Sequence, residues 1–597
     1  MDDDIKIIEV RIRNFCCLKS ISVNLDDLTI LTGQNNSGKT SFIKALEVAI
    51  GVSRQRFTEE DIYLAQSEKR PPKDRSIIVD LLIRPWNRIE NKIIDIFPQG
   101  SFWLVLWANG TAQDKDDNDF IGMRTEYKWD RRKNDYSITR SFLNEWKEDL
   151  EEIEQAKKNE KAGSITYEMI EPLALYLMDE RRDIIDEFKK KTSFWYKLIS
   201  DPGLNEAEIK KFEETLNTLN LDIIEGSTVL KHILDHLNEL YPIISHEKGK
   251  AEIFPIPRQL DDLSKGIDIG ISTENSQTFS LTRYGMGTRS LATIVLFNAF
   301  ITLKQKRMQN NKMHPMLAIE EPENHLHPQA QRSIFDLIKN IQGQIIFTTH
   351  SPYIIECAKI QQLRHFQKMG SVTQISQMDV KDLTDDDLRK INFMVLKTRG
   401  YMLYARALIL AEGETDERGL PTFAEEYWGK HPNNLGIEFI GVGGDGNYLP
   451  FLRLAQSFGI RWYIFSDGEA EVISNVNIAL SKINEPLIPN NPLVFEIPNY
   501  ENYESYLIKN EYKEELIKMY INLKGEQPEH IDALKEDFVH NRKTLDDILQ
   551  YAKDNKTKCA IPLARAVLKN NDVNLKFPEK IRLLFEKVSS DFNLPTK

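Results

Sequence analysis

A glycine-rich loop near the start of the chain restricts the possible fold more than any other feature. The segment GQNNSGKT, residues 33–40, matches the pattern G-x-x-x-x-G-K-[ST] through Gly33, Gly38, Lys39 and Thr40. Strand patterns precede the loop and a helix pattern follows it, which is the context that this motif requires. The loop therefore predicts an α/β fold in which phosphate groups lie at the start of a helix.

Each part of this loop is suited to binding the phosphates of a nucleotide. Glycines let backbone N–H groups wrap around the phosphates, and the helix that follows adds a positive potential. Lys39 would reach the β and γ phosphates, and the hydroxyl of Thr40 would bind Mg²⁺. The residues expected to bind the nucleotide here are Gly33, Asn35, Asn36, Gly38, Lys39, Thr40 and Ser41.

Two later strand patterns end in residues that could act on the same nucleotide. The segment PMLAIEEPENHLHP reads as a buried strand that ends in Glu320 and Glu321. A carboxylate at that position can hold Mg²⁺ through water, and its neighbour can polarise the attacking water. GQIIFTTHSP is another apolar strand pattern and ends at His350, which could sense the γ-phosphate. Taken alone, a histidine at that position would more often be a turn residue.

A second glycine-rich loop, Gly285-Met286-Gly287, opens a strongly apolar helix pattern. The start of a helix after such a loop is an anion site. Because the first loop already supplies one, we expect Gly285 and Gly287 of one subunit to cap the nucleotide held by another subunit. The sequence thus predicts a homodimer or a higher homo-oligomer.

The order of these motifs resembles that of ATP-binding-cassette (ABC) ATPases of the RecF/SMC type. GQNNSGKT would be Walker A, RYGMGTRSL the signature, LAIEEPENHLHP Walker B with the D-loop, and FTTHSP the switch-histidine segment. The resemblance implies that ATP binds with one Mg²⁺, for which Thr40 and Glu320 are the protein ligands. The chain departs from the family in having Arg283-Tyr284 before Gly285, without the LSGG serine, and Glu320 in place of aspartate. The second change could slow ATP hydrolysis.

A charged region from residue 131 to residue 250 separates the two halves of this ATPase pattern. It reads as helices, and it lacks heptads sustained over many turns, so it is not a long coiled coil. A helical insertion that pairs subunits and a plain solvated subdomain are both compatible with the pattern. The basic clusters at 131–133, 181–182 and 189–191 are more typical of solvated faces than of DNA contacts.

The composition limits the number of domains and the compartment. At 597 residues, the chain should divide into roughly two to four domains. The longest apolar run is too short to cross a bilayer, the acidic start lacks a signal-peptide pattern, and the 4 cysteines indicate no disulfide framework. We therefore expect a cytoplasmic protein with no membrane partner. The net charge of −13 is not by itself a nucleic-acid footprint.

Acidic side chains follow separate strand patterns in the last third of the chain. LILAEGETDERGL places Glu412 at a strand end and Asp416 four residues later, and RWYIFSDGEAE places Asp467 and Glu469 at another strand end. Alternating strands and helices predict a parallel sheet whose strand ends share one crevice. Oxygen ligands without histidine or cysteine suit Mg²⁺ or Mn²⁺. The set could hold two ions about 3.5–4 Å apart, as in phosphodiester cleavage.

These acidic segments resemble the TOPRIM domain, with EGETD as its first acidic motif and SDGE as its second. Asp416 and Glu469 replace a glutamate and an aspartate of the family pattern. A RecF-like ATPase followed by TOPRIM resembles the OLD (overcoming lysogenization defect) family of nucleases. In that family a later glutamate and a lysine complete the site. Glu504 and Lys558 match them, and Lys556 is the alternative lysine.

These resemblances imply a fold and a set of site residues. The expected fold class is α/β, with an ABC-type ATPase domain that carries a helical insertion, followed by a Rossmann-like TOPRIM α/β domain. The ATPase would occupy residues 1–130 and 251–385, the dimerising insertion 131–250, and TOPRIM 400–597. The expected catalytic residues are Glu321, Glu412, Asp416, Asp467, Glu469, Glu504 and Lys558, and all but Glu321 and Lys558 would also bind metal.

The resemblance to the OLD family implies an ATP-regulated, divalent-metal-dependent DNA endonuclease that serves bacterial defence against phage. A RecF-like DNA-repair clamp without nuclease activity is one alternative. A TOPRIM topoisomerase or primase is another, although a topoisomerase needs a tyrosine nucleophile in a further domain, and the sequence shows none. Members of the family act alone, beside a helicase, or with a reverse transcriptase and its non-coding nucleic acid, and the sequence does not choose among these partners.

Overall fold

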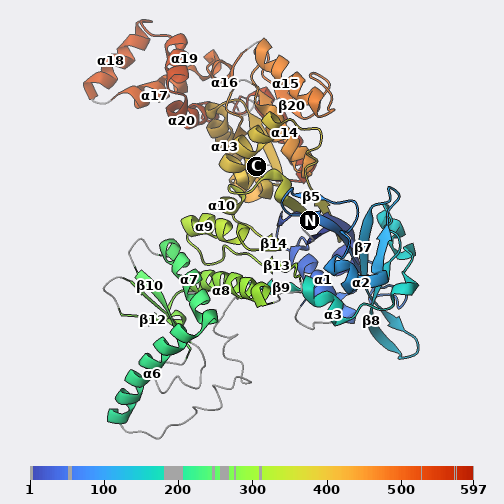
Figure 1. Ribbon diagram of the computed structural model, residues 1–597. Helices are drawn as coiled ribbons and strands as arrows, with labels where there is room; N and C mark the ends of the chain where they lie inside the picture. Colours follow the sequence, from blue (N-terminus) through green and yellow to red (C-terminus); the bar gives the residue numbers. More distant parts are fainter. Residues whose placement is uncertain are drawn as a thin grey trace. The chain divides into compact units, whose positions relative to one another are not determined.

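The computed structural model divides the chain into two compact units, residues 1–376 and 377–597 (Figure 1). The expected boundary, between residues 385 and 400, lies a short way beyond this division. The residues that the structure describes are 4–51, 57–180, 206–244, 249–255, 268–273, 277–307, 312–444, 446–499, 501–525, 528–570, 572 and 575–595.

A six-stranded sheet carries the nucleotide motifs of the first unit. Its strands are β3 (Leu28–Gly33), β9 (Leu175–Met178), β13 (Met316–Ile319), β14 (Gln344–Thr348), β15 (Leu363–Met369) and β16 (Val372–Ser376). Their order is β16-β15-β3-β14-β13-β9, and all neighbours except β15 and β16 run parallel. The motif strands β3, β14 and β13 lie side by side, so the residues that follow them meet at one edge of the sheet.

A seven-stranded antiparallel sheet forms the other layer of this unit. Its strands are β1 (Asp4–Phe15), β2 (Leu18–Asn24), β4 (Ile77–Asn87), β5 (Lys92–Ile93), β6 (Thr111–Gln113), β7 (Asp119–Asp130) and β8 (Asp135–Leu143). Helix α1 (Lys39–Ile50) contacts β1 and β4 of this sheet and β3 and β9 of the other. Phe42 and Leu46 of α1 are fully buried in this core. The helix that begins at the phosphate loop is thus held between two sheets.

The region expected to be a helical insertion is helical only in part. Residues 131–134, which include the basic run, form the turn between β7 and β8, with Asn134 at a positive φ of 49°. Strand β9 then joins the six-stranded sheet. Charge had suggested helix, but a charged tetrapeptide also suits a solvated hairpin turn.

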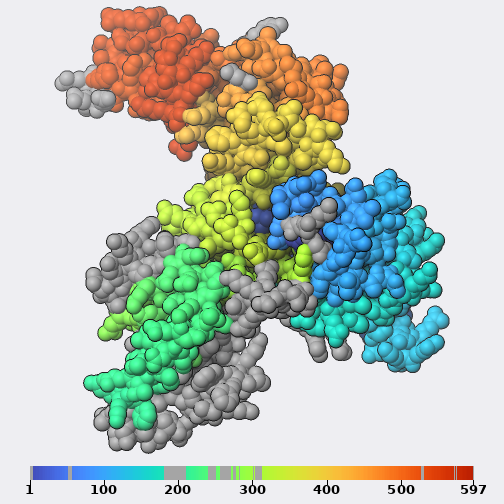
Figure 2. All heavy atoms as spheres, viewed as in Figure 1, coloured from blue at the N-terminus to red at the C-terminus, as the bar shows by residue number. Residues whose placement is uncertain are grey.

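Among the described residues of this region, the long helices are α6 (Glu206–Gly226) and α7 (Thr228–Ile244), drawn in green in Figures 1 and 2. They are followed by a three-stranded sheet of β10 (Gly249–Phe254), β11 (Asp268–Thr273) and β12 (Phe279–Ser280). Helix α8 (Met286–Arg307) begins at the second glycine-rich loop and packs on α7. Leu237, Ile253, Ile271, Ala292 and Leu296 form a small core among these elements.

The second unit is built on a four-stranded parallel sheet. Its strands are β17 (Ala407–Ala411), β18 (Ile437–Gly441), β19 (Arg461–Ser466) and β20 (Val494–Glu496), in the order β18-β17-β19-β20. Every residue of β17 is fully buried, as expected for a central parallel strand covered on both faces. Helices α13 (Glu414–Trp428), α14 (Tyr448–Ser457) and α15 (Ala470–Lys482) connect the strands.

In the described part of the chain, six α-helices follow the last strand of this sheet. They are α16 (Tyr503–Leu507), α17 (Lys513–Lys524), α18 (Pro528–Val539), α19 (Leu545–Asp554), α20 (Lys556–Leu568) and α21 (Glu579–Phe592). Helix α20 packs along α13, while α17, α18 and α19 gather beside it in the red part of Figure 2. Within the described residues, no helix combines the length and apolarity that a membrane span requires.

Candidate functional site

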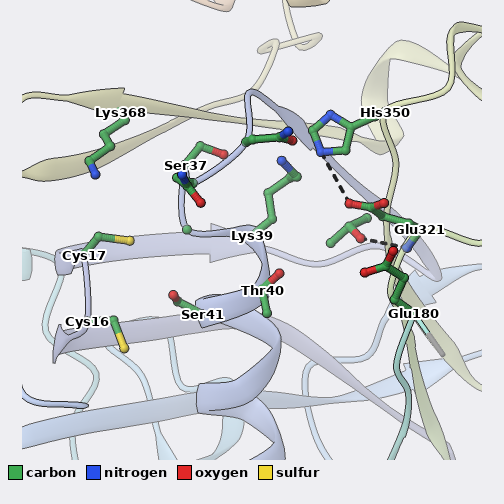
Figure 3. A pocket seen from close by; sticks show the side chains of 14 residues that line it. Cys16, Cys17, Ser37, Lys39, Thr40, Ser41, Glu180, Glu321, His350 and Lys368 are labelled. Atoms are coloured by element: carbon green, nitrogen blue, oxygen red, sulfur yellow. Dashed lines mark hydrogen bonds and ion pairs between the residues drawn. The ribbon is translucent and has the colours of Figure 1, made fainter. Parts of the chain in front are cut away.

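The first unit contains a cavity of about 690 Å³ over the glycine-rich loop (Figure 3). Residues from five parallel strands, β3, β9, β13, β14 and β15, and from the turn between β1 and β2 converge on it. Its lining consists of Cys16, Cys17, Asn35, Asn36, Ser37, Gly38, Lys39, Thr40, Ser41, Glu180, Glu321, Thr348, His350 and Lys368. The structure therefore brings most of the expected nucleotide-binding residues together around one space of ligand size.

The backbone of the loop depends on glycine at its first position. Gly33 has a φ of 132°, and a Cβ atom there would lie 2.0 Å from the carbonyl oxygen of Phe366 on β15. Gly38 and Asn36 also adopt positive φ, of 101° and 61°. This conformation turns the loop around the space in front of α1, where an anion would meet backbone N–H groups and the start of the helix.

Lys39 is held inside the loop rather than extended into water. Its Nζ donates hydrogen bonds to the carbonyl oxygens of Gly33 and Gln34, at 2.8 and 2.9 Å. Burial lowers the pKa of Lys39 to about 8, although Glu321 and Glu323 oppose this effect. A phosphate anion would favour the charged form, so the ammonium is ready to serve as its counter-ion.

The two groups expected to hold the Mg²⁺ of ATP are already in contact. The Thr40 side chain is hydrogen-bonded to Glu320, and burial raises the pKa of that carboxyl group. Asp179 and Glu321 add to this rise because they place more negative charge nearby. A hydroxyl beside a buried carboxylate is a donor set that fits Mg²⁺, which prefers oxygen ligands and keeps several waters.

Glu321 and His350 face each other across the edge of the sheet. Glu321 Oε1 lies 3.6 Å from His350 Nε2, as Figure 3 shows. Burial and the charge of Lys39 lower the pKa of His350, so the ring is neutral at neutral pH. A neutral imidazole can bond a phosphate oxygen or a water without adding charge.

Glu323 is a residue of this site that sequence reasoning did not single out. Its Oε1 accepts hydrogen bonds from Thr349 Oγ1 at 2.7 Å and from the backbone N–H groups of His350 and Ser351 at 2.6 and 3.0 Å. Glu323 is only 7 % exposed. It fixes the backbone that carries His350, and its place in the same EEPEN run was the available signal.

The second glycine-rich loop lies away from this cavity within one chain. Neither Gly285 nor Gly287 belongs to the described lining. Gly287 packs against the loop after β13, where a Cβ atom would lie 2.4 Å from the carbonyl oxygen of His325. Gly285 has open space around the position of a Cβ atom. The role of Gly285 at the nucleotide of another subunit stays a prediction.

In the second unit, four carboxylates gather at the carboxyl edge of the parallel sheet. Glu412 directly follows β17, and Asp467 directly follows the neighbouring strand β19, with which β17 is paired in parallel register. Asp416 lies in the first turn of α13, where its Oδ2 accepts a hydrogen bond of 3.2 Å from the N–H of Gly413. Glu504 on α16 is buried and accepts a hydrogen bond of 2.8 Å from the hydroxyl of Thr415.

The electrostatics show that these carboxylates are close neighbours. Burial raises the pKa of Asp416, and the charges of Glu504 and Glu412 raise it further. Burial likewise raises the pKa of Asp467, with Asp416, Glu412 and Glu504 adding to the rise. The neighbouring carboxylates thus oppose the ionisation of Asp416 and Asp467, which is the behaviour of acidic groups that share a site with no cation between them.

Backbone and aromatic groups hold the cluster in place. Asp467 Oδ1 accepts a hydrogen bond of 2.9 Å from the N–H of Tyr503, which links β19 to α16. Gly468 must be glycine for close approach, because a Cβ atom there would lie 2.0 Å from the carbonyl oxygen of Ile497. Tyr448 and Tyr503 are fully buried beside the carboxylates, and burial with these charges raises the pKa of both hydroxyls.

Glu469 stands apart from the other expected ligands. It is exposed, it precedes α15, and its Oε1 accepts a long hydrogen bond of 3.5 Å from Asn502. It is not among the charges that dominate the pKa of Asp416 or Asp467. The two-residue spacing from Asp467 suggested a shared direction, but Glu469 is the exposed residue that precedes α15, while Asp467 is bonded to the N–H of Tyr503.

Of the two lysines that the sequence left as alternatives, Lys556 is the one whose charge reaches the cluster. The charge of Lys556 lowers the pKa of Asp416 and so acts on the cluster. The Nζ of Lys558 instead donates a hydrogen bond of 3.2 Å to the carbonyl oxygen of Leu523 on α17. The two lysines are two positions apart at the start of α20, so they project in different directions from the helix.

The chemistry of this cluster fits Mg²⁺ or Mn²⁺. Its donors are carboxylate oxygens, which hard divalent cations prefer, and a cation would offset the mutual repulsion that raises the pKa of Asp416 and Asp467. Among the described residues, no group of three or more His, Cys, Asp or Glu side chains is arranged so that it could hold a metal ion without moving. Small side-chain rotations would therefore accompany metal binding.

Comparison with known proteins agrees with both halves of this description. Residues 5–355 match the family model of the AAA ATPase domain, and residues 403–468 match that of the overcoming lysogenization defect protein-like TOPRIM domain. The chain belongs to the family of this AAA ATPase domain, and an OLD-like TOPRIM domain follows it. The predicted fold class and family resemblance are thus confirmed.

Relatives with nuclease names resemble this chain along most of its length. The Old nuclease of Escherichia phage P2 is 22% identical over 79% of this chain and 78% of its own. The OLD nuclease of Thermus scotoductus is 22% identical over 68% of this chain and 71% of its own. Endonuclease GajA of Bacillus cereus is 24% identical over 67% of this chain and 64% of its own.

Proposed function

We propose that this protein is an OLD-type, divalent-metal-dependent DNA endonuclease regulated by ATP. The observation that carries the proposal is the cluster of Glu412, Asp416, Asp467 and Glu504 at the carboxyl edge of the second unit's sheet, in which Asp416 and Glu504 are buried and Glu412 and Asp467 are half-buried. Solvated surface carboxylates would not raise one another's pKa in this way. The nuclease names of its relatives support the same reading.

The proposed roles of the cluster follow from its contacts. Glu412, Asp416, Asp467 and Glu504 would hold the divalent ions, which when bound supply a metal-activated water and offset charge on the phosphodiester. The hydroxyl of Thr415 and the N–H of Tyr503 orient Glu504 and Asp467. Lys556 places a positive charge at the cluster, where it would attract the DNA phosphate.

The ATP site would control the nuclease through subunit pairing. Lys39 and the loop backbone would bind the phosphates, Thr40 and Glu320 would hold Mg²⁺, and Glu321 would polarise the attacking water. Gly285, which has open space around it, would complete the site of a second copy. Helices α6 and α7 supply an additional surface for pairing. Service in defence against phage, with or without a helicase or reverse-transcriptase partner, belongs to this proposal through the family resemblance alone.

Nicking of supercoiled plasmid DNA in Mg²⁺ or Mn²⁺ tests the nuclease assignment. The Glu412→Ala variant should lose nicking by about a hundredfold or more, because a metal ligand is removed, while ATP binding stays intact. Glu414→Ala is the matched control, since Glu414 belongs to the same segment and only bonds Thr557 at the surface. Unchanged nicking by Glu412→Ala, or no nicking by the wild type over a broad metal and substrate screen, would favour the RecF-like clamp instead.

A further inference from the structure

A second acidic pair lies beside the Walker B glutamates. Strand β9 runs parallel to β13, with Met178 opposite Ile319. The N–H of Glu320 donates a hydrogen bond of 2.9 Å to the carbonyl oxygen of Met178. The residues after each strand are therefore level with each other, so that Asp179-Glu180 stands beside Glu320-Glu321. Nothing in the sequence motifs had drawn attention to Asp179 or Glu180.

Asn324 connects the outer members of these two pairs. Its Nδ2 donates one hydrogen bond of 3.0 Å to Glu180 Oε1 and another of 2.9 Å to Glu321 Oε2. A carboxylate only accepts hydrogen bonds, whereas an amide can face a neighbour with either its NH₂ group or its oxygen. With acceptors on both sides, the amide must keep its NH₂ group between them. Glu180 thus determines which end of Asn324 meets Glu321.

Glu321 needs such support because its backbone is in an uncommon conformation. Its φ is 45°, and its N–H donates to the carbonyl oxygen and to the Oγ1 of Thr348, at 3.2 and 3.0 Å. One carboxylate oxygen faces His350 and the other faces Asn324. The bridge from Glu180 through Asn324 therefore holds the second oxygen of the Glu321 carboxylate, while the first faces His350 at the cavity.

We propose that Glu180 is a positioning residue for ATP hydrolysis, acting through Asn324 to orient the Glu321 carboxylate. The proposal rests on the proposed ATPase role of Glu321. Glu180 lines the same cavity at the end occupied by Glu321 and His350 (Figure 3), whereas Cys16, Cys17 and Lys368 lie on the other side of the loop. It does not touch the reacting atoms.

The test is steady-state ATP hydrolysis by the full chain, together with equilibrium binding of a fluorescent ATP analogue. Glu180→Ala should lower kcat by about tenfold and change nucleotide affinity less than twofold, because orientation is lost while the phosphate contacts remain. Glu180→Gln should keep at least half of the wild-type kcat, because its amide oxygen can still accept from Asn324. Glu356→Ala is the control, since Glu356 pairs with Arg332 at the surface.

A double-mutant cycle separates positioning from simple damage to the fold. Asn324→Ala should lower kcat by the same factor as Glu180→Ala, and the double variant should be no worse than either, because both break one bridge. Three outcomes would each overturn the proposal for Glu180 but not the ATPase role of Glu321. They are additive losses of kcat in the double variant, a kcat of Glu180→Ala within twofold of wild type, and a loss confined to nucleotide affinity. A wild type that binds ATP but never hydrolyses it would overturn the ATPase assignment of Glu321 as well.

Discussion

At the scale of single residues, the acidic cluster is defined by which charges reach one another. Glu412, Asp416, Asp467 and Glu504 do, while Glu469 is exposed and Lys558 is engaged with α17. Residue type and spacing were enough to find the strand-end carboxylates. They could not separate Lys556 from Lys558, because the direction of a side chain depends on how α20 packs on α13.

The two lysines give a direct comparison at this scale. Lys556→Ala should reduce nicking by about tenfold to a hundredfold, because the cluster loses the positive charge that offsets the phosphate. Lys558→Ala should remain within about twofold of wild type, since it removes only a surface bond to Leu523. The measurement is the initial rate of plasmid nicking at saturating Mn²⁺. Equal losses in both variants, or a loss only in Lys558→Ala, would restore the sequence-based choice.

The raised pKa values of Asp416 and Asp467 predict how stability depends on pH. Between the unfolded and the folded pKa the metal-free native state binds more protons than the unfolded chain, so its stability falls as pH rises through this range. Divalent ions need the ionised carboxylates, so the stabilisation that they give should grow over the same range.

Thermal unfolding from about pH 5 to pH 9, with EDTA or with Mn²⁺, measures this linkage. The second unit should unfold at progressively lower temperature in EDTA, and the gap to the Mn²⁺ curve should widen with pH. Asp467→Asn should flatten both trends. A gap that is constant with pH would contradict the shared burial of these carboxylates.

At the scale of elements, the strands that end in functional residues were predictable, and their order in the sheet was not. Buried apolar runs identified β3, β13, β14, β17 and β19, because parallel central strands are covered on both faces. The strand pattern of β9 was lost within a charged region, so the acidic residues after it were overlooked. Pairing partners depend on contacts far apart in sequence, which local patterns do not record.

The phosphate loop supplies a prediction about an element's backbone. Gly33→Ala should lower the free energy of unfolding of the first unit by about 2–4 kcal/mol and abolish ATP binding, because the new Cβ atom would clash with the Phe366 carbonyl oxygen. Gly370→Ala is matched to it, since Gly370 also has a positive φ of 64° but has no neighbour within 4 Å of the Cβ position. Chemical denaturation compares them. A similar loss in both variants would show that backbone strain, not the close contact, is what Gly33 relieves.

At the scale of the whole molecule, the central question is how the proposed binding of ATP controls the proposed cleavage of DNA. The nucleotide residues belong to residues 1–376 and the acidic cluster to residues 377–597. We expect ATP to act by pairing two copies of the chain, because the second glycine-rich loop is separate from the cavity of its own chain.

Gly285→Asp tests pairing through this loop. Open space around Gly285 should let the variant fold with an unchanged melting temperature and bind ATP normally. Its carboxylate would repel the γ-phosphate held by another copy, so ATP-dependent dimerisation and hydrolysis should fall by about tenfold or more. Light scattering after size exclusion, with Mg²⁺ and ATP, reports the dimer. A variant that still dimerises and hydrolyses ATP like wild type would rule out this role for the loop.

The most direct test of the nuclease centre is a crystal structure of the protein soaked in Mn²⁺, with anomalous scattering used to locate the ions. Manganese should lie among Glu412, Asp416, Asp467 and Glu504, and it should be absent from the Glu412→Ala variant. Saturating Mn²⁺ that binds elsewhere on the chain and leaves these carboxylates without an ion would contradict the proposed nuclease site.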